Sequence, residues 1–372
     1  MILILHNRYR TTGGEERSVD DLLWLVRERL GEDAELLERD SLHAGRAKAA
    51  FGLLRGGLDP QQIARAVRRT RARIVHAHNV HPTLGWRALA AARDAGARVV
   101  LHLHQYRMVC AVGVCFTKGE DCTRCHARNT LPGVIHNCRG SLTEAVTYAA
   151  SLSVWQRHLA GCVDAFVVPS RFAGERLRDL GAPVDHAHVI APVIRSFAAR
   201  PAAALDGPAL LVSRLSPEKG VDVAIEACRR ANVPLVIAGD GPERARLEAL
   251  AAGQVRFAGN VSDAELARLR RGASLALAPS RSAETFGLAA AEAMAAGLPV
   301  VAPRVGALPD LVPEEWLVAP GDAEALADAI TLVRGAGAAA DVALARARAV
   351  SSPEVVAPAL AAVYTQAAER TR

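Results

Sequence analysis

Short apolar runs alternate with amphipathic helical patterns along almost the whole chain, and this alternation restricts the fold more than any other feature. Strands that alternate with helices form parallel sheets covered by helices on both faces. We therefore predict two doubly wound α/β domains. The expected strands are 2–6, 74–78, 99–104 and 165–169 in the first half, and 209–213, 235–239 and 275–278 in the second, where helices follow from Val221, Pro242 and near Leu288.

The length of 372 residues also favours two domains, because an average domain has roughly 150. The alternation lapses between Pro192 and Pro208 into a stretch rich in proline and alanine, where we place the linker. We expect one domain at 1–195 and a second at 196–352, with a C-terminal helix at 353–372 packing back on the first. Ligands of such sheets bind beyond the carboxyl ends of the strands, so two domains facing each other would hold a ligand in the cleft between them.

The distribution of charge bears on the partners. Residues 1–200 carry 28 Lys/Arg and 19 Asp/Glu, whereas residues 201–372 carry 17 and 20. Part of the basic excess lies in a predicted helix at 61–72 with Arg65, Arg68, Arg69 and Arg71, which could meet an anionic membrane surface or simply face solvent. The chain has only 15 aromatic residues and no nucleic-acid module, which speaks against nucleic acid. Without a basic n-region or a long apolar run, it is expected to be cytoplasmic, with peripheral membrane contact as an option.

Two segments have the chemistry of a phosphate site. Gly13 and Gly14 open a predicted helix after the first strand, where backbone N–H groups can approach an anion; a plain tight turn is the alternative. Arg214 and Lys219 follow the strand at 209–213, and two cations five residues apart suit a diphosphate; two solvated side chains are the alternative. The dinucleotide fingerprint G-x-G-x-x-G is absent after the first strand, which argues against a nicotinamide enzyme.

A third segment holds two glutamates, Glu284 and Glu292, around Phe286-Gly287-Leu288. Eight helical residues rotate by about 80° beyond two turns, so two fully helical glutamates would not share a face. If the helix begins near Gly287, Glu284 lies in the loop before it and Glu292 one turn inside it, and the N–H groups between them can contact a phosphate or a sugar. Two solvated glutamates are the alternative.

Together these residues resemble a known family. The Gly-Gly-Glu start, S-R-L-x-P-x-K-G from Ser213, G-D-G-P from Gly239 and E-T-F-G-L-x-x-x-E from Glu284 are similar to the family-4 retaining glycosyltransferases of the GT-B fold. The resemblance extends from residue 1 to about 320. It implies the GT-B architecture, with two Rossmann-like domains facing each other across a cleft. In this architecture the domain at 1–195 would bind the acceptor and the domain at 196–352 would bind the nucleotide sugar.

The resemblance assigns a donor role to each of these segments. It implies that Arg214 and Lys219 bind the diphosphate, and that Gly13 and Gly14 bring the backbone close to it. It implies contacts of Glu292 with the ribose and of the backbone near Val261 with the base. Glu284 and the N–H groups of Phe286 and Gly287 would hold the transferred sugar, and Leu288 is a further donor-binding residue. Glu284 is also one of the two expected catalytic residues, together with His104.

His104 matches the histidine that the family places near the anomeric centre, although Gln105 replaces the usual Asp or Asn. His104 could hydrogen-bond the 6-hydroxyl of the sugar, or stabilise the positive charge that develops as the donor bond breaks. The alternative is a core histidine whose hydrogen bonds are all made inside the protein. His76 and His78 also follow a strand and are given a structural role first. No carboxylate pair for double displacement is evident in the first domain, so the resemblance implies retention by same-face attack, without a metal for the chemistry.

The predicted function is thus a retaining glycosyltransferase, with a UDP-sugar favoured over a GDP-sugar and a hydroxyl acceptor on a glycan, lipid-linked saccharide or metabolite. The alternative is a nonenzymatic nucleotide-sugar binder or metal-responsive regulator; an epimerase or phosphorylase has less support. The segment 189–195 lacks the N-G-V-D type motif of many relatives, so acceptor selection or hinge geometry could differ.

Five of the seven cysteines fall within 29 residues, in an expected insertion at 105–140. The odd total argues against a secreted disulfide framework. Cys110, Cys122, Cys125 and Cys138 have a C-x-x-C core with two flanking thiols, a pattern that suits structural zinc, and a Cys-bearing subset of the family has a similar arrangement. Reduced or disulfide-linked cysteines and an iron–sulfur cluster are the other interpretations.

Overall fold

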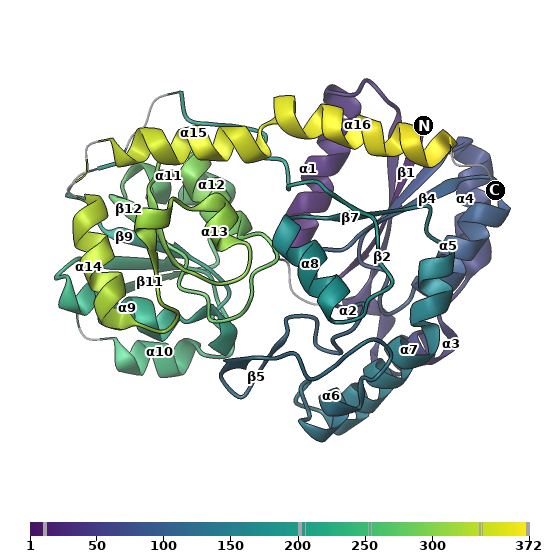
Figure 1. Cartoon of the computed structure of the whole chain (residues 1–372), viewed down its shortest axis with the longest axis horizontal. Helices are drawn as coiled ribbons and strands as arrows, with labels where there is room; N and C mark the ends of the chain where they lie inside the picture. Colours follow the sequence, from purple (N-terminus) through teal and green to yellow (C-terminus); the bar gives the residue numbers. More distant parts are fainter. Residues whose placement is uncertain are drawn as a thin grey trace. The chain divides into compact units, whose positions relative to one another are not determined.

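The computed structural model describes residues 1–9, 13–199, 203–204, 206–251, 253, 255–334, 336 and 338–369 (Figure 1). These residues group into two compact units. The first unit comprises Met1–Thr117, Cys122–Val193 and Pro353–Arg372, and the second comprises Lys118–Asp121 and Ile194–Ser352. Residues 200–202 and 205 of the expected linker, and 370–372 of the expected C-terminal helix, lie outside the described residues.

The first unit is built on a six-stranded parallel sheet with the order β2-β1-β3-β4-β7-β8. Alternate residues of each strand enter opposite hydrophobic clusters, as Ile2 and Ile4 do on one face and Leu3 and Leu5 on the other. The strands are β1 (Ile2–Arg8), β2 (Ala34–Asp40), β3 (Ile74–Ala77), β4 (Arg98–His102), β7 (Ala165–Val168) and β8 (Ala187–Val189).

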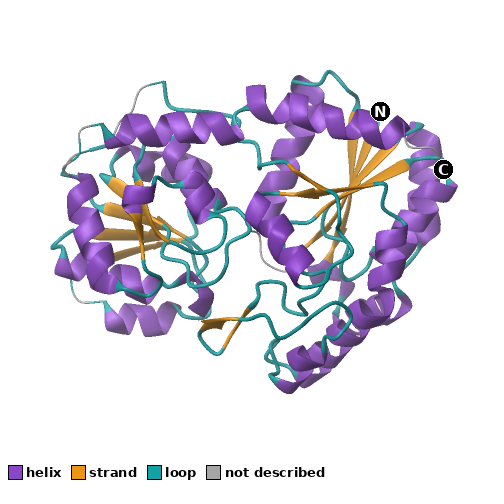
Figure 2. Ribbon diagram, in the orientation of Figure 1, coloured by secondary structure: helices purple, strands orange, loops and turns teal. Residues whose placement is uncertain are grey.

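Helices cover both faces of this sheet (Figure 2). The face of Ile2 and Ile4 packs against α1 and α16, and the opposite face packs against α4, α5 and α8. The helices are α1 (Gly14–Glu28), α2 (Ser41–Ala44), α3 (Arg46–Arg55), α4 (Pro60–Thr70), α5 (Gly85–Asp94), α6 (Leu131–Ile135), α7 (Leu142–Gly161), α8 (Arg171–Asp179) and α16 (Pro353–Glu369). Two short strands, β5 (Phe116–Thr117) and β6 (Glu120–Asp121), pair within the cysteine-rich insertion.

The second unit holds another six-stranded parallel sheet, with the order β11-β10-β9-β12-β13-β14. Counted along the chain this is 3-2-1-4-5-6, the doubly wound order. The strands are β9 (Ala209–Val212), β10 (Leu235–Ala238), β11 (Val255–Gly259), β12 (Leu275–Leu277), β13 (Val300–Pro303) and β14 (Leu317–Val318). The helices are α9 (Val221–Arg230), α10 (Arg244–Leu250), α11 (Asp263–Arg271), α12 (Leu288–Ala295), α13 (Leu308–Leu311), α14 (Ala323–Arg334) and α15 (Ala339–Ser351), with 3-10 turns at Pro217–Lys219 and Glu314–Trp316.

The prediction of two parallel α/β sheets is confirmed. The strands β2, β8, β11, β13 and β14 were not among those expected, and the other differences lie at element ends. β4 ends at His102, so His104 lies in the following loop and not in the strand. Helix α10 begins at Arg244, two residues later than expected. Helix α12 begins at Leu288 as predicted, because Gly287 caps it with φ +95°, a backbone conformation that glycine adopts without strain.

Candidate functional site

In the second unit the strand order reverses between β9 and β12, and doubly wound sheets bind ligands beyond the carboxyl ends of the strands at such a reversal. The loop after β9 carries Arg214 and Lys219, and the loop after β12 carries Ser280 and Glu284. The fold therefore brings together two segments, about 65 residues apart, that the sequence had singled out separately.

Lys219 and Glu284 form an ion pair, with Nζ 2.6 Å from Oε1. Ser280 donates a hydrogen bond to the same carboxylate oxygen. Burial alone would raise the pKa of Glu284, but the charge and hydrogen bond of Lys219 and the Ser280 hydroxyl outweigh it and lower that pKa. Likewise Glu284 raises the pKa of Lys219 against the effect of burial. Both groups are thus held charged, and Ser280 is a member of this site that motif reading did not single out.

Arg214 differs from Lys219 in its surroundings. Its side chain is exposed and forms no hydrogen bond or ion pair with another residue that the structure describes. Such an exposed guanidinium can bind an anion through two parallel hydrogen bonds, because it does not first have to break a bond to another residue.

The backbone of Gly306 supports the loop that carries Glu284. Gly306 has φ +58°, and a Cβ built there would lie 2.3 Å from the backbone nitrogen of Glu284. Ala307 donates a 2.9 Å hydrogen bond to the carbonyl of Glu284. Any larger residue at position 306 must displace this loop.

We expect Gly306→Ala to lower the free energy of unfolding by about 1–3 kcal/mol more than Gly321→Ala, and to weaken donor binding. Gly321 is the matched control, because it has φ +78° but no atom within 4 Å of the added Cβ, so it bears only the backbone cost of about 1–2 kcal/mol. Chemical denaturation measures both effects. Equal destabilisation by the two substitutions would show that the loop accommodates the methyl group.

Glu292 lies one turn inside α12, as predicted, but it already has a partner. Its Oε2 lies 2.6 Å from Nη2 of Arg270, and the two side chains are only 11% and 12% exposed. A ribose that binds Glu292 must therefore share it with Arg270, which the sequence did not reveal. Phe286 is buried, Leu288 begins the helix, and Val261 follows β11 in the loop before α11.

In the first unit the strand order reverses between β1 and β3, and five histidines gather near the carboxyl ends of β1, β3 and β4. His76 Nδ1 lies 2.7 Å from the hydroxyl of Tyr364 on α16. His78 Nδ1 lies 2.7 Å from His104 Nε2. Burial is the largest cause that lowers the pKa of His78, His102 and His104 well below the usual value, so these imidazoles are neutral near pH 7.

Ligand nitrogens of His76, His78 and His102 lie within 4.8 Å of one another, which invites comparison with a metal site. However, the three rings are stacked, with interplanar angles of 10°, 21° and 28°. An imidazole binds a metal in its own ring plane, and nearly parallel stacked rings cannot all share one ion. The stack therefore agrees with the structural role expected for His76 and His78.

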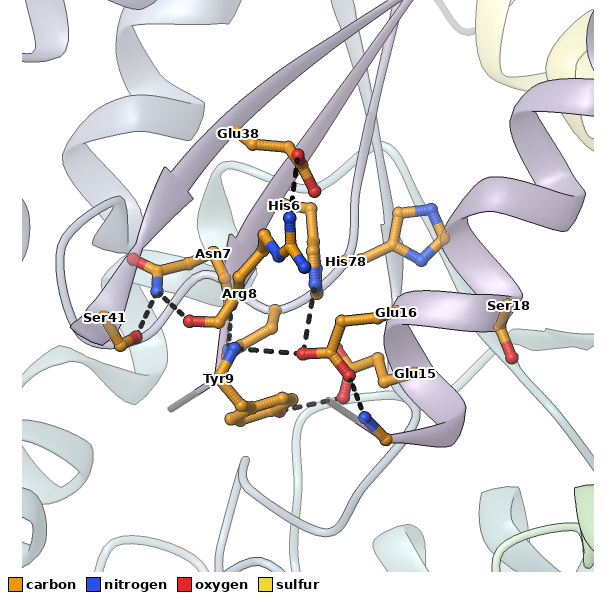
Figure 3. Close-up of polar contacts among 12 residues, drawn as sticks. His6, Asn7, Arg8, Tyr9, Glu15, Glu16, Ser18, Glu38, Ser41 and His78 are labelled. Atoms are coloured by element: carbon orange, nitrogen blue, oxygen red, sulfur yellow. Dashed lines mark hydrogen bonds and ion pairs between the residues drawn. The ribbon is translucent and has the colours of Figure 1, made fainter. Parts of the chain in front are cut away.

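The start of α1 differs from the expected open phosphate cradle (Figure 3). Gly13 is the N-cap as predicted, but its N–H donates to Glu16 Oε2 at 2.8 Å, and the N–H of Tyr9 donates to Glu16 Oε1 at 3.0 Å. The chain's own carboxylate therefore occupies the Gly13 donor. Gly14, the first residue of α1, lies in the turn whose N–H groups have no helical acceptor.

The first unit does contain two neighbouring carboxylates near its strand ends, which sequence reading did not recognise as a pair. The Tyr9 hydroxyl donates to Glu15 Oε2 at 2.8 Å, and Gln105 Nε2 lies 3.1 Å from the same hydroxyl (Figure 3 shows the two glutamates). Burial raises the pKa of Glu15. Glu16 is held by two backbone N–H groups and caps α1, which is the arrangement of a structural carboxylate.

The five clustered cysteines line one cavity of the insertion. Cys110 and Cys115 are buried, and Cys122, Cys125 and Cys138 are partly buried. A hydrogen bond from Cys115 is the first cause that lowers the pKa of Cys110 to about 6, whereas burial and the charge of Cys110 raise the pKa of Cys125 to about 11.

Two further features bear on the expected membrane contact. Arg65, Arg68, Arg69 and Arg71 are all exposed, and Arg69 pairs with Glu35 while Arg65 lies 3.8 Å from Asp59. None of the helices that the structure describes has the length and apolar composition needed to cross a bilayer.

Two family models match most of the chain. The model described as "Glycosyl transferase 4-like domain" matches residues 11–193, and that described as "Glycosyl transferases group 1" matches residues 208–333.

Curated relatives match shorter stretches. A GDP-mannose-dependent alpha-(1-6)-phosphatidylinositol dimannoside mannosyltransferase of Mycobacterium tuberculosis is 41% identical over 128 residues, which are 32% of this chain and 33% of the relative. A D-inositol 3-phosphate glycosyltransferase of Acidothermus cellulolyticus is 31% identical over 281 residues, 67% of this chain and 60% of the relative. The matched stretch thus spans only about one third of the first relative.

Solved structures share the fold over their whole length. HepE of Anabaena in complex with UDP-glucose has a TM-score of 0.65 at 20% identity, covering 98% of this chain and 99% of that one. A glycosyltransferase from Rickettsia africae has a TM-score of 0.67 at 17% identity, covering 100% and 99%.

Proposed function

Because the chain belongs to the group 1, family-4 glycosyltransferases, we propose that it transfers a sugar from a nucleoside-diphosphate donor to a hydroxyl group of an acceptor. The observation that carries the proposal is the meeting of Lys219, Ser280 and Glu284 where the second sheet reverses its strand order. The lysine cation suits the diphosphate end of a sugar diphosphate, and the carboxylate beside it suits the hydroxyl groups of the sugar end.

The donor is bound mainly through charge. Arg214 and Lys219 bind the diphosphate, and these charge-assisted bonds are the stronger kind of hydrogen bond. Glu284 accepts hydrogen bonds from hydroxyls of the sugar. The N–H groups at the start of α12 contact the same sugar. Glu292 and Arg270 receive the ribose, and the chain near Val261 lies against the base.

The chemistry is retaining and needs no metal. The bond between the anomeric carbon and the diphosphate oxygen breaks, and a bond to the acceptor oxygen forms on the same face. The proton of the acceptor hydroxyl goes to the departing diphosphate. Arg214 and Lys219 stabilise the negative charge that develops on the diphosphate, which is the task a divalent ion performs in other transferases. Neutral His104 hydrogen-bonds the transferred sugar as positive charge develops at its ring.

Both nucleotides have support from similar proteins. The printed names of relatives include GDP-mannose-dependent enzymes, and a structural neighbour holds UDP-glucose. GDP-mannose and UDP-glucose are therefore the first donors to test. The acceptors named for relatives include inositol 3-phosphate and phosphatidylinositol dimannoside, so phosphorylated and lipid-linked polyols form the first acceptor panel.

The test begins with thermal unfolding in a panel of nucleotide sugars, because a donor present at 100 times its Kd stabilises the folded chain by about 2.7 kcal/mol. The stabilising donor is then incubated with the acceptor panel, and release of UDP or GDP is followed with time. Acceptor-dependent release with α-configured product from an α-donor is the expected result. Tight donor binding without turnover for any acceptor would favour the alternative of a nonenzymatic binder.

A further inference from the structure

The insertion that carries the cysteines has little regular structure of its own (Figure 1). Between Gln105 and Gly140 the structure describes only β5, β6 and the five-residue α6. Leu131 and Ile135 of α6 are exposed at 59% and 70%, so this helix does not contribute a large apolar core. Tyr106, Met108 and Val109 anchor the start of the insertion in the core of the first unit, but no side chain of residues 116–129 is buried. This second part has little hydrophobic burial to hold it in one conformation.

The backbone of the insertion is also strained. Cys115, Lys118, Ala127 and Asn137 have positive φ angles of 49°, 52°, 48° and 45°. Each such non-glycine residue costs roughly 1–3 kcal/mol and persists only where other interactions impose it. A cross-link at the centre of the insertion would help to hold these residues in their conformations.

The side chains at its centre supply the donors for such a cross-link. All five cysteines and His136 line the same cavity, although they are spread over 29 residues of sequence. The structure records each cysteine as a free thiol. Soft sulfur donors select Zn²⁺ over Mg²⁺ or Ca²⁺, and four thiolates form a closed tetrahedral structural site.

We propose that Cys110, Cys122, Cys125 and Cys138 bind one structural zinc ion that holds the insertion together. Groups around these sulfurs suit thiolates. The N–H of Gly113 donates to Cys110 Sγ at 3.4 Å, and Arg124 Nη1 lies 3.5 Å from Cys122 Sγ. Such donors around the ligands orient them and offset their negative charge.

Cys115 has a different place in the cavity. It is only 2% exposed, its sulfur hydrogen-bonds Cys110, and its carbonyl accepts the 2.8 Å hydrogen bond from the N–H of Cys122. Its role is to position Cys110 and the turn that leads into β5. Cys115→Ser is therefore a matched control inside the same cavity, because a serine hydroxyl can keep the hydrogen bond to Cys110 while one thiol is removed.

Zinc binding should also tighten the insertion. Zn–S bonds of ~2.3 Å place the four sulfurs roughly 3.8 Å apart. Among the described residues, His76, His78 and His102 are the group of three whose ligand atoms all lie within 4.8 Å of one another, so no three sulfurs of the cysteine cavity are gathered as closely. The ion would draw them together, and amides of residues 105–140 should exchange more slowly with zinc than without it.

The experiment uses the full chain purified without chelator, and its result does not depend on glycosyl transfer. We expect about one zinc per chain by elemental analysis. After the zinc is removed by a chelator, added Co²⁺ should produce a thiolate-to-cobalt charge-transfer band and the intense d–d absorption of a tetrahedral site. Cys122→Ser with Cys125→Ser should abolish both signals, whereas Cys115→Ser and Cys162→Ser should retain them.

Several results would overturn the proposal. One is folded protein that contains no zinc and whose four thiols are freely alkylated. Another is a content of iron and sulfide, which would indicate an iron–sulfur cluster. The third is that Cys115→Ser loses as much metal as the double variant. Should the double variant fail to fold, the cobalt titration and the amide exchange of chelated wild-type protein decide the question without it.

Discussion

Lys219→Ala is expected to weaken nucleoside-diphosphate binding by roughly 10- to 150-fold, because a charge-assisted hydrogen bond contributes about 1.5–3 kcal/mol. The affinity for the nucleoside alone should change little, since the proposed partner of Lys219 is the diphosphate. The loss should exceed that of Arg214→Ala. Removal of Lys219 leaves Glu284 as an unpaired carboxylate, which repels the incoming diphosphate, whereas exposed Arg214 has no such partner.

The double variant Lys219→Ala with Glu284→Gln separates the loss of the Lys219 bond to the diphosphate from the repulsion by Glu284. It should bind the diphosphate more tightly than Lys219→Ala alone, because the repelling charge is gone, yet it should transfer sugar poorly. Arg271→Ala, at an exposed arginine on the last turn of α11, is the control for general loss of positive charge. Calorimetry with UDP, GDP and the matching nucleosides measures all four proteins. An equal loss for nucleotide and nucleoside would remove Lys219 from the diphosphate site.

His104→Ala is expected to lower kcat about 100-fold or more with little change in donor affinity, because the proposed contact of His104 with the sugar would strengthen as charge develops in the transition state. The low pKa that burial gives His104 means that it acts as a neutral imidazole. Activity should therefore show no step from protonation of His104 near its ordinary pKa. Single-turnover kinetics with saturating donor measures the chemical step, and near-wild-type turnover would exclude His104 from the mechanism.

His78 tests whether the orientation of His104 matters. Its Nδ1 lies 2.7 Å from His104 Nε2 and the ring is buried, so we expect it to position His104. His78→Leu should lower kcat much more than it raises KM, whereas His78→Asn, whose amide can replace Nδ1, should recover part of kcat. If both variants lose activity in parallel with their stability, His78 has only a packing role.

The sequence by itself determined the parts of this protein that depend on local pattern. Apolar runs of strand length between helical periods predicted two parallel sheets, and Gly287 predicted the start of α12, because the left-handed conformation at a helix start favours glycine. The motifs around Arg214, Glu284 and Cys122 could also be recognised one by one from the sequence, because they too are local. Each consists of chemically distinctive residues a few positions apart.

Only the tertiary structure decided which of these residues meet. Strand order places Lys219 beside Glu284, and Arg270 of α11 against Glu292 of α12. Side-chain packing gives the Gly13 N–H to Glu16 and stacks histidines from neighbouring strands. Such pairings are set by burial and by the register between distant segments, and hydrophobic periodicity within one segment contains no information about its partner.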